Sequence, residues 1–236
     1  MNDAEKTNRH FSVAEARRSV YELLSGFYLD LPDREMVRCV FDPDFEKKLC
    51  AVASVFETGE MREGLGLIAG FISSFKGGLP EETLRRIAVD RTRLFRGISE
   101  KNSPPPPYES VYREERLWGE SSINVYRFYC KVGLALPDTW TEAADFLGTE
   151  LDFMRLLGQN EAEAWRDNQS DRAMELLRAS LDFLRDHLLK WVDPFCERMY
   201  RMAELDFYKG LAKLTIGFLK YDSHFVEEQL KEMPSP

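Results

Sequence analysis

Aromatic side chains that could bind a partner are concentrated in one short stretch of the chain. Between residues 108 and 129, six of 22 residues are aromatic, namely Tyr108, Tyr112, Trp118, Tyr126, Phe128 and Tyr129. Such side chains offer a large apolar contact area at low cost in conformational entropy, which suits recognition. Helix packing accounts for Tyr126 and Phe128. For Tyr108 and Tyr112, which follow an irregular proline segment, packing and recognition are both open interpretations.

Acidic side chains dominate a second stretch, residues 138–167. Eight acids face only Arg155 and Arg166, an excess of six negative charges, and the acids are Asp138, Glu142, Asp145, Glu150, Asp152, Glu161, Glu163 and Asp167. On a helix, Glu142, Asp145, Thr149 and Asp152 would share a polar face, and Phe146, Glu150 and Phe153 would form the neighbouring row.

Three interpretations of this acidic stretch are open. It is a solvated helix face, or it is a surface of acidic and aromatic character for a peptide that is basic at one end and apolar at the other. Such a surface would include Phe146 and Glu150, and Glu150 would need a hydrogen-bond donor beside its apolar neighbours. Alternatively, Asp145 and Glu150 are paired carboxylates of an all-α enzyme.

Familiar catalytic and cofactor motifs are absent from the sequence. Gly64, Gly66 and Gly70 do not have the spacing of a dinucleotide fingerprint and follow no strand, so we interpret them as small residues that ease helix packing. No phosphate-binding loop or nucleophile elbow occurs, and three scattered histidines and four separated cysteines predict no metal site. We therefore predict no cofactor and no catalytic residue.

Composition excludes further classes of protein. The 236 residues are 44% hydrophobic and 31% charged, with a net charge of −9, which disfavours nucleic-acid binding. The N-terminal residues MNDAEKTNRHFS do not resemble a signal peptide, and the longest uncharged apolar stretch, GLGLIAGFISSF, is too short to span a bilayer. We expect a cytoplasmic protein without stable membrane insertion.

Apolar periodicity predicts helices along the whole chain. Val13, Ala16, Val20, Leu23, Leu24, Phe27 and Leu31 predict one buried helix face, and Ala173, Leu177, Leu181, Leu184, Leu188 and Trp191 predict another. Further helices are expected at about 60–75, up to Gly97, and over 121–133. A capping box at Thr139 and Glu142 predicts a helix start there, and Asp193-Pro194 predicts another. The fold class is all-α, a single-domain helical bundle of roughly ten helices over 12–232, after a flexible tail at 1–11.

The proline-rich loop at 97–108 interrupts these helices. Prolines 104–107 cannot continue a helix and favour a stiff polyproline II segment. Four segments in this part of the chain resemble, in order and spacing, the signature segments of the TorD/DmsD family of cytoplasmic molybdoenzyme chaperones. They are DRTRLFRG (90–97), PPPPYESVY (104–112), DFLGTELDFMRLL (145–157) and FLRDHLLKWVDPF (183–195).

The resemblance implies a chaperone rather than an enzyme. Its partners would be the twin-arginine leader and the apo catalytic subunit of a DMSO- or TMAO-reductase-like molybdoenzyme, held until cofactor insertion and export. The implied leader-binding residues are Leu94, Phe95, Pro107, Tyr108, Glu109, Ser110 and Asp145. Where the family commonly has Asp-His, this chain has Asp145-Phe146. His187 is interpreted as a structural hydrogen-bonding residue and Trp191 as core.

The resemblance and the residues together predict one groove. The prolines would form a rigid rim that sets Tyr108 and Glu109 against an acidic helix carrying Asp145, with an apolar floor and a negative edge. A stable subunit of a redox assembly is the other alternative. We expect a monomer or a homodimer, since helix exchange between protomers is conceivable in a fold with long loops.

Overall fold

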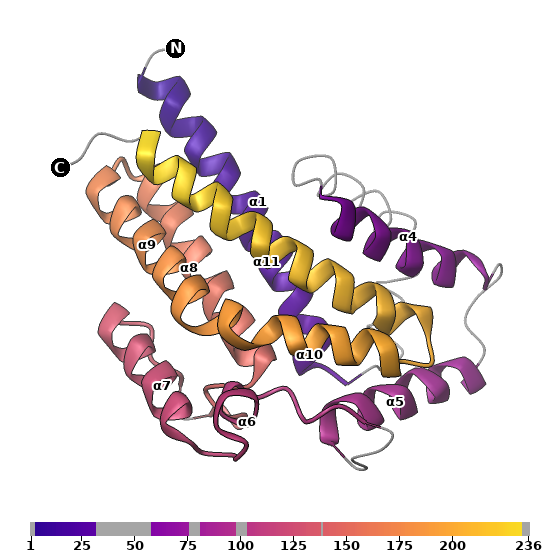
Figure 1. Cartoon of the computed structure of the whole chain (residues 1–236). Helices are drawn as coiled ribbons and strands as arrows, with labels where there is room; N and C mark the ends of the chain where they lie inside the picture. Colours follow the sequence, from indigo (N-terminus) through magenta and orange to yellow (C-terminus); the bar gives the residue numbers. More distant parts are fainter. Residues whose placement is uncertain (1–2, 32–57, 76–80, 98–102, 138, 233–236) are drawn as a thin grey trace. The chain divides into compact units, whose positions relative to one another are not determined.

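Helices make up the fold of the chain (Figure 1). The computed structural model describes residues 3–31, 58–75, 81–97, 103–137 and 139–232. Within these ranges there is no β-strand, and the β-type backbone pairing is an isolated antiparallel bridge between Tyr108 and Phe146. The predicted all-α class is therefore confirmed.

The chain divides into two compact units. The first unit consists of Met1–Tyr28, Tyr108–Lys190 and Asp222–Pro236, and the second of Leu29–Pro107 and Trp191–Tyr221. The single domain expected over 12–232 stays a prediction.

The first unit is built around an aromatic core. Its elements are α1 (Asp3–Leu29), α6 (Glu109–Glu114), α7 (Glu120–Val132), α8 (Leu147–Arg166), α9 (Ser170–Phe183), the π-helical turn η1 (Leu184–Leu188) and the last part of α11 (Asp206–Glu232). Helices α8 and α9 lie side by side (Figure 1). The Phe153 ring, from α8, lies 4.2 Å from the Tyr129 ring of α7 and 4.8 Å from the Phe183 ring of α9, measured between centroids. These buried rings join the three helices through a shared apolar contact.

A buried ionic cluster joins the two ends of the chain in the first unit. Arg17, on α1, donates from Nε to Asp222 of α11 at 2.6 Å and from Nη1 to Glu161 of α8 at 2.6 Å. Tyr21 donates its hydroxyl to Asp222 at 2.6 Å, and Trp165 donates its indole N–H to Glu161 at 3.3 Å. Burial disfavours the charged guanidinium, but Asp222 and Glu161 outweigh burial and raise the pKa of Arg17.

The second unit contains α4 (Gly59–Ser73), α5 (Glu81–Arg96), most of α10 (Leu189–Met202) and the first part of α11. Asp90, on α5, accepts the backbone N–H groups of Glu204 and Leu205, each at 3.0 Å, and so fixes the link between α10 and α11. Helices α4 and α11 approach closely, because a Cβ on Gly64 would lie 2.7 Å from the carbonyl oxygen of Gly210. The packing role predicted for Gly64 is therefore confirmed, whereas a Cβ on Gly66 or Gly70 would meet nothing within 4 Å.

Helix α1 agrees with its predicted periodicity but not with its predicted limits. Val20, Leu24 and Phe27 are buried, as expected. Leu31 lies beyond the last helical residue and is 69% exposed, so its assignment to the buried face was wrong. Residues 3–11 are helical where a flexible tail was predicted, and His10 stacks on Trp165 with ring centroids 4.7 Å apart.

Two predicted helix starts were wrong, although the apolar stripe from Ala173 to Trp191 is fully buried as predicted. Helix α8 begins at Leu147 rather than at Thr139, because Asp145 bonds to distant residues instead of continuing a helix. Pro194 lies inside α10 rather than at its start. Buried side chains on both sides of it, Val192 and Phe195, hold the helix through the proline.

Candidate functional site

The ten residues predicted to bind a peptide divide between the two units. Leu94, Phe95 and Pro107 belong to the second unit. The first unit holds the other seven, which are Tyr108, Glu109, Ser110, Tyr112, Asp145, Phe146 and Glu150. Leu94 is fully buried and Phe95 packs against Phe195, with ring centroids 6.4 Å apart, so both are core residues of their unit.

Asp145 organises the start of two helices in the first unit. Its Oδ2 accepts the backbone N–H of Ser110 at 3.0 Å, and its Oδ1 accepts the hydroxyl of Ser122, on α7, at 2.7 Å. Its carbonyl accepts the backbone N–H of Glu109 at 2.9 Å. Asp145 therefore provides hydrogen-bond acceptors for the backbone N–H groups at the start of α6, although it lies 35 residues from Ser110 in the sequence. An N-cap residue provides the same kind of acceptor from the end of its own helix.

Glu109 forms a second buried contact, with the π-helical turn. Its Oε2 lies 3.0 Å from Nδ1 of His187, and Arg113 forms an ion pair with its other oxygen. Glu109 is fully buried and His187 is 7% exposed. The predicted structural hydrogen-bonding role of His187 is confirmed. Single π-helical turns such as the one that carries His187 are frequent at functional sites.

These contacts change the interpretation of the acidic residues. Asp145 and Thr149 are buried, so neither lies on the solvated polar face that helical periodicity predicted, and Asp145 does not form the predicted negative edge. Glu150 is also buried and does not belong to an acidic surface. Asp145 begins no helix, and both of its carboxylate oxygens are engaged within the fold. A general base needs an oxygen that can reach substrate, so Asp145 does not favour the enzyme interpretation.

Tyr108 and Tyr112 are the members of the predicted set in the first unit that reach the surface, each half-buried. The Tyr108 ring contacts the Phe146 ring at a centroid distance of 5.3 Å, and the bridge between these two residues fixes the backbone. Glu109 and Ser110 directly follow Tyr108 in the sequence, and Asp145 directly precedes Phe146. All three residues are buried. The arrangement therefore consists of half-buried tyrosine rings on an internally bonded polar support.

The proline segment lines a cavity within the second unit. Its volume is about 660 Å³, and its described lining includes Gly97, Pro104–Pro106, Arg198 and Arg201. The charged residues of this described lining are both arginines, whereas the predicted groove required acidic residues at its edge. Residues 98–102 of the predicted loop lie outside the described residues.

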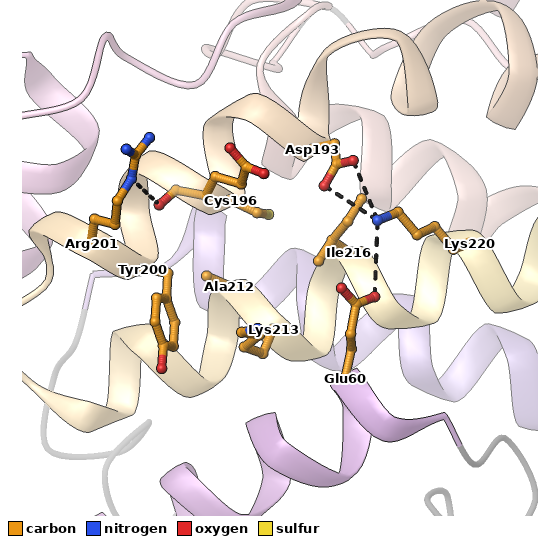
Figure 2. A pocket seen from close by; sticks show the side chains of 10 residues that line it. Glu60, Asp193, Cys196, Tyr200, Arg201, Ala212, Lys213, Ile216 and Lys220 are labelled. Atoms are coloured by element: carbon orange, nitrogen blue, oxygen red, sulfur yellow. Dashed lines mark hydrogen bonds and ion pairs between the residues drawn. The ribbon is translucent and has the colours of Figure 1, made fainter.

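A second cavity of the same unit, about 400 Å³, has charged walls and a thiol (Figure 2). Lys220 reaches Asp193 at 3.3 Å and Glu60 at 3.9 Å, so its charge is paired across the cavity. Burial raises the pKa of the Cys196 thiol well above its ordinary value. The thiol is therefore protonated at neutral pH and is a poor nucleophile.

Sequence reasoning missed the partners of the buried acids and one surface. Ser122 carried no motif of its own, because a hydrogen-bond partner 23 residues away leaves no periodic signal. Arg113 was missed although its spacing of four residues from Glu109 is the local signal of a helical ion pair. Leu117 and Ile123, both about half exposed, were also missed. From the sequence pattern alone, an exposed apolar residue beside a turn cannot be distinguished from a core residue.

The described ranges contain neither a metal-binding cluster nor a membrane-spanning helix. There, no group of three or more His, Cys, Asp or Glu side chains could hold a metal ion. None of the helices that the structure describes is sufficiently long and apolar to cross a bilayer.

Comparison with known proteins gives relatives of one kind. The "Chaperone protein TorD" of Vibrio cholerae serotype O1 (strain ATCC 39541 / Classical Ogawa 395 / O395) is 29% identical over 150 residues, which cover 62% of this chain and 64% of that protein. The "Perchlorate reductase assembly chaperone protein" of Dechloromonas aromatica is 30% identical over 149 residues, which cover 62% of this chain and 64% of its own length. The matches thus span just under two thirds of these relatives.

A solved structure and a family profile complete the comparison. A redox enzyme maturation protein from Archaeoglobus fulgidus is 23% identical and has a TM-score of 0.43, covering 89% of this chain and 93% of that one. Residues 44–197 match the family described as the nitrate reductase delta subunit. This family match and the TorD relatives confirm the resemblance to the TorD/DmsD chaperones. Because the matched residues make up more than half of the chain, this protein belongs to the nitrate reductase delta subunit family.

Proposed function

We propose that this protein is a cytoplasmic chaperone for the apo catalytic subunit of a molybdopterin-containing oxidoreductase. It binds the twin-arginine leader of that subunit and retains the subunit until the cofactor has been inserted. The observation that carries the proposal is the family match over residues 44–197, supported by similarity to proteins named "Chaperone protein TorD" and "Perchlorate reductase assembly chaperone protein".

The leader would bind at the half-buried tyrosine rings of the first unit. Tyr108 and Tyr112 offer apolar area to the hydrophobic part of a leader, and Glu142, which is exposed, offers a negative charge to its arginines. The buried Glu109 and Asp145 hold the backbone that carries Tyr108, so they act as positioning residues. Exposed ion pairs contribute only about 0.2–1 kcal/mol each, so apolar burial supplies most of the affinity.

Leader binding can be measured with a synthetic twin-arginine peptide and the purified chain. We expect the Tyr108→Ala and Tyr112→Ala variants to bind the peptide about tenfold more weakly, while their helicity by circular dichroism is unchanged. Tyr200→Ala, which removes a half-buried tyrosine of the second unit, is the matched control and should retain affinity. Wild-type affinity in both of the first two variants would remove these rings from the proposal.

The client itself can be identified by affinity capture from the native host, followed by mass spectrometry of the bound protein. The proposal requires recovery of a molybdopterin-binding subunit with its leader still attached. Recovery of only the mature, cofactor-loaded enzyme, in a complex that survives high salt, would instead indicate a stable assembly subunit.

A further inference from the structure

The larger of the two cavities described above lies beside the proline segment of the second unit. Its volume is about 660 Å³, which is ordinary for a site that binds a small molecule. Ser103 and prolines 104–106 supply one part of its described lining, and the last turn of α10 supplies another, with Arg198, Arg201 and Met202. All of these residues belong to one unit. Apolar walls with a few polar groups are the usual form of a ligand site.

Helix α5 holds both parts of this lining in place. Arg93 donates from Nη2 to the backbone carbonyl of Met202 at 2.6 Å, which ties the end of α10 to α5. Gly97, directly after α5, has a φ of +60°, and a Cβ there would lie 2.8 Å from Cδ of Pro106. Only a glycine combines this conformation with so close an approach, so the proline segment is seated against the end of α5. The cavity is therefore built by the packing of the unit.

The hydroxyl of Ser103 is buried in this lining without a hydrogen bond. The residue is 4% exposed, and its Oγ has no hydrogen-bond partner within the described part of the chain. A buried polar group without a partner destabilises a fold, so most such groups in proteins are bonded. The prolines that follow have no N–H with which to satisfy it. A ligand atom in the cavity would supply the hydrogen bond that the fold does not.

The charge of the described lining is positive. Arg201 is exposed, donates from Nε to the backbone carbonyl of Glu197 at 3.4 Å, and forms no ion pair with a carboxylate among the described residues. In Figure 2 its guanidinium lies at the opposite end of the other cavity from Lys220. Arg198, one helical turn before it, adds a second positive charge. A helix dipole favours basic residues in the last turn of any helix, but it explains neither the cavity nor the Ser103 hydroxyl. Together these groups select an anion.

The donors around the cavity favour a carboxylate over a phosphate. Phosphate sites draw on backbone N–H groups, at helix N-termini or in glycine-rich turns. Here α10 contributes its C-terminal end, where the free backbone groups are carbonyls, and the proline segment has no N–H. The guanidinium group of an arginine binds a carboxylate through two parallel hydrogen bonds, and a single negative charge matches it.

We propose that this cavity binds a small apolar monocarboxylate. Arg201 pairs with the carboxylate, Arg198 adds attraction, and the Ser103 hydroxyl donates to one of its oxygens. The apolar body of the ligand lies against prolines 104–106 and Met202, and its burial supplies most of the affinity. The inference goes beyond the chaperone function and does not depend on it, since it uses neither the leader nor the residues around Tyr108.

The test uses the purified full chain and 4-benzoylbenzoate, an apolar monocarboxylate that crosslinks to nearby residues on irradiation. We expect saturable binding by calorimetry, a raised midpoint of thermal unfolding, and crosslinks within residues 103–106 or 198–202. The neutral 4-benzoylbenzamide, which has the same shape without the charge, should bind about tenfold more weakly. The corresponding phosphate, 4-benzoylphenyl phosphate, should bind no more tightly than the carboxylate.

Two variants test the roles of the polar groups. Arg201→Gln should weaken binding of the carboxylate about tenfold and abolish its preference over the amide. Ser103→Ala should weaken binding about fivefold. Without ligand, however, Ser103→Ala should unfold at the same urea concentration as the wild type or at a higher one, because the hydroxyl forms no bond within the described fold. Arg86→Gln, which removes an exposed arginine of α5 outside the described lining, is the matched control and should keep wild-type affinity.

Three results would overturn the inference directly. They are equal affinity for the carboxylate and the amide, wild-type affinity of Arg201→Gln for the carboxylate, and crosslinks confined to other parts of the chain. Tighter binding of the phosphate would overturn it as well, because the site would then select phosphate chemistry.

Discussion

Nδ1 of His187 lies 3.0 Å from Oε2 of Glu109, across 78 residues of sequence, and both side chains are buried. This contact ties the π-helical turn η1 to the first residue of α6, the helix that directly follows Tyr108. The Phe183 ring lies 4.8 Å from the His187 ring, so the imidazole is held by apolar contact as well as by the carboxylate.

Replacing Glu109 by alanine should lower the free energy of unfolding by about 3 kcal/mol, because His187 and Arg113 would lose a buried acceptor. His187→Ala should also destabilise the chain, and the double variant should lose less than the sum of the two single changes. Urea unfolding followed by circular dichroism measures all three. Strict additivity would show that the two side chains do not interact in solution.

Asp145→Ala should destabilise the first unit rather than only weaken peptide binding. The substitution leaves the buried Ser110 N–H and Ser122 hydroxyl without their acceptor, a loss of about 1–3 kcal/mol for each unsatisfied group. Asp152→Ala is a suitable comparison, since Asp152 is half-buried and pairs with Arg155 on the same helix. Thermal unfolding should show a clearly larger loss for Asp145→Ala, and equal losses would contradict the capping role.

Two glycines of α4 should respond to alanine in opposite directions. At Gly64 the added Cβ would clash with the backbone of α11, so Gly64→Ala should destabilise the chain by about 1–3 kcal/mol. At Gly66 the Cβ meets nothing, so alanine should stabilise the helix by about 0.5–1 kcal/mol. Chemical unfolding of the two variants in parallel provides the check, and the same sign in both would refute the close approach.

Glu161 should make stability depend on pH. Burial raises its pKa above the ordinary 4.5, although Arg17 opposes this shift. Above about pH 4.5, the unfolded chain has released the proton of Glu161, whereas the folded chain still keeps it. The stabilisation that this proton provides is lost as the pH rises through that range.

Glu161→Gln removes this titration, so the advantage of the wild type over the variant should shrink as the pH rises from 4.5. Unfolding free energies measured at several pH values give the comparison. An advantage that grows with pH would mean that the ion pair with Arg17 outweighs burial.

The helical core could be predicted from the sequence because its signal is local. The stripe from Ala173 to Trp191 repeats with the period of a helix, and burial follows directly from that repeat. The candidate site was less accessible to prediction. Periodicity placed Asp145 on a solvated face, but its partners, Ser110 and Ser122, lie 35 and 23 residues away.

Tertiary contacts of this kind also moved the boundaries of the helices. Thr139 and Glu142 have the spacing of a capping box, but the chain between them and Leu147 stays outside the helix, where Asp145 bonds to α6 and α7. Pro194 has the local signal of a helix start and is nevertheless interior to α10. Local rules predict the type of element, and long-range hydrogen bonds and packing decide where it ends.

The pairing of Arg17 with Asp222, 205 residues apart, bears on how the chain is made. During synthesis α1 leaves the ribosome long before its acidic partner exists, so the guanidinium of Arg17 has to wait for the residues up to Asp222. The first unit can close only after residue 222 has been synthesised. A ribosome stalled before residue 222 should therefore carry a chain whose α1 is still open to protease, and a chain extended beyond α11 should be protected.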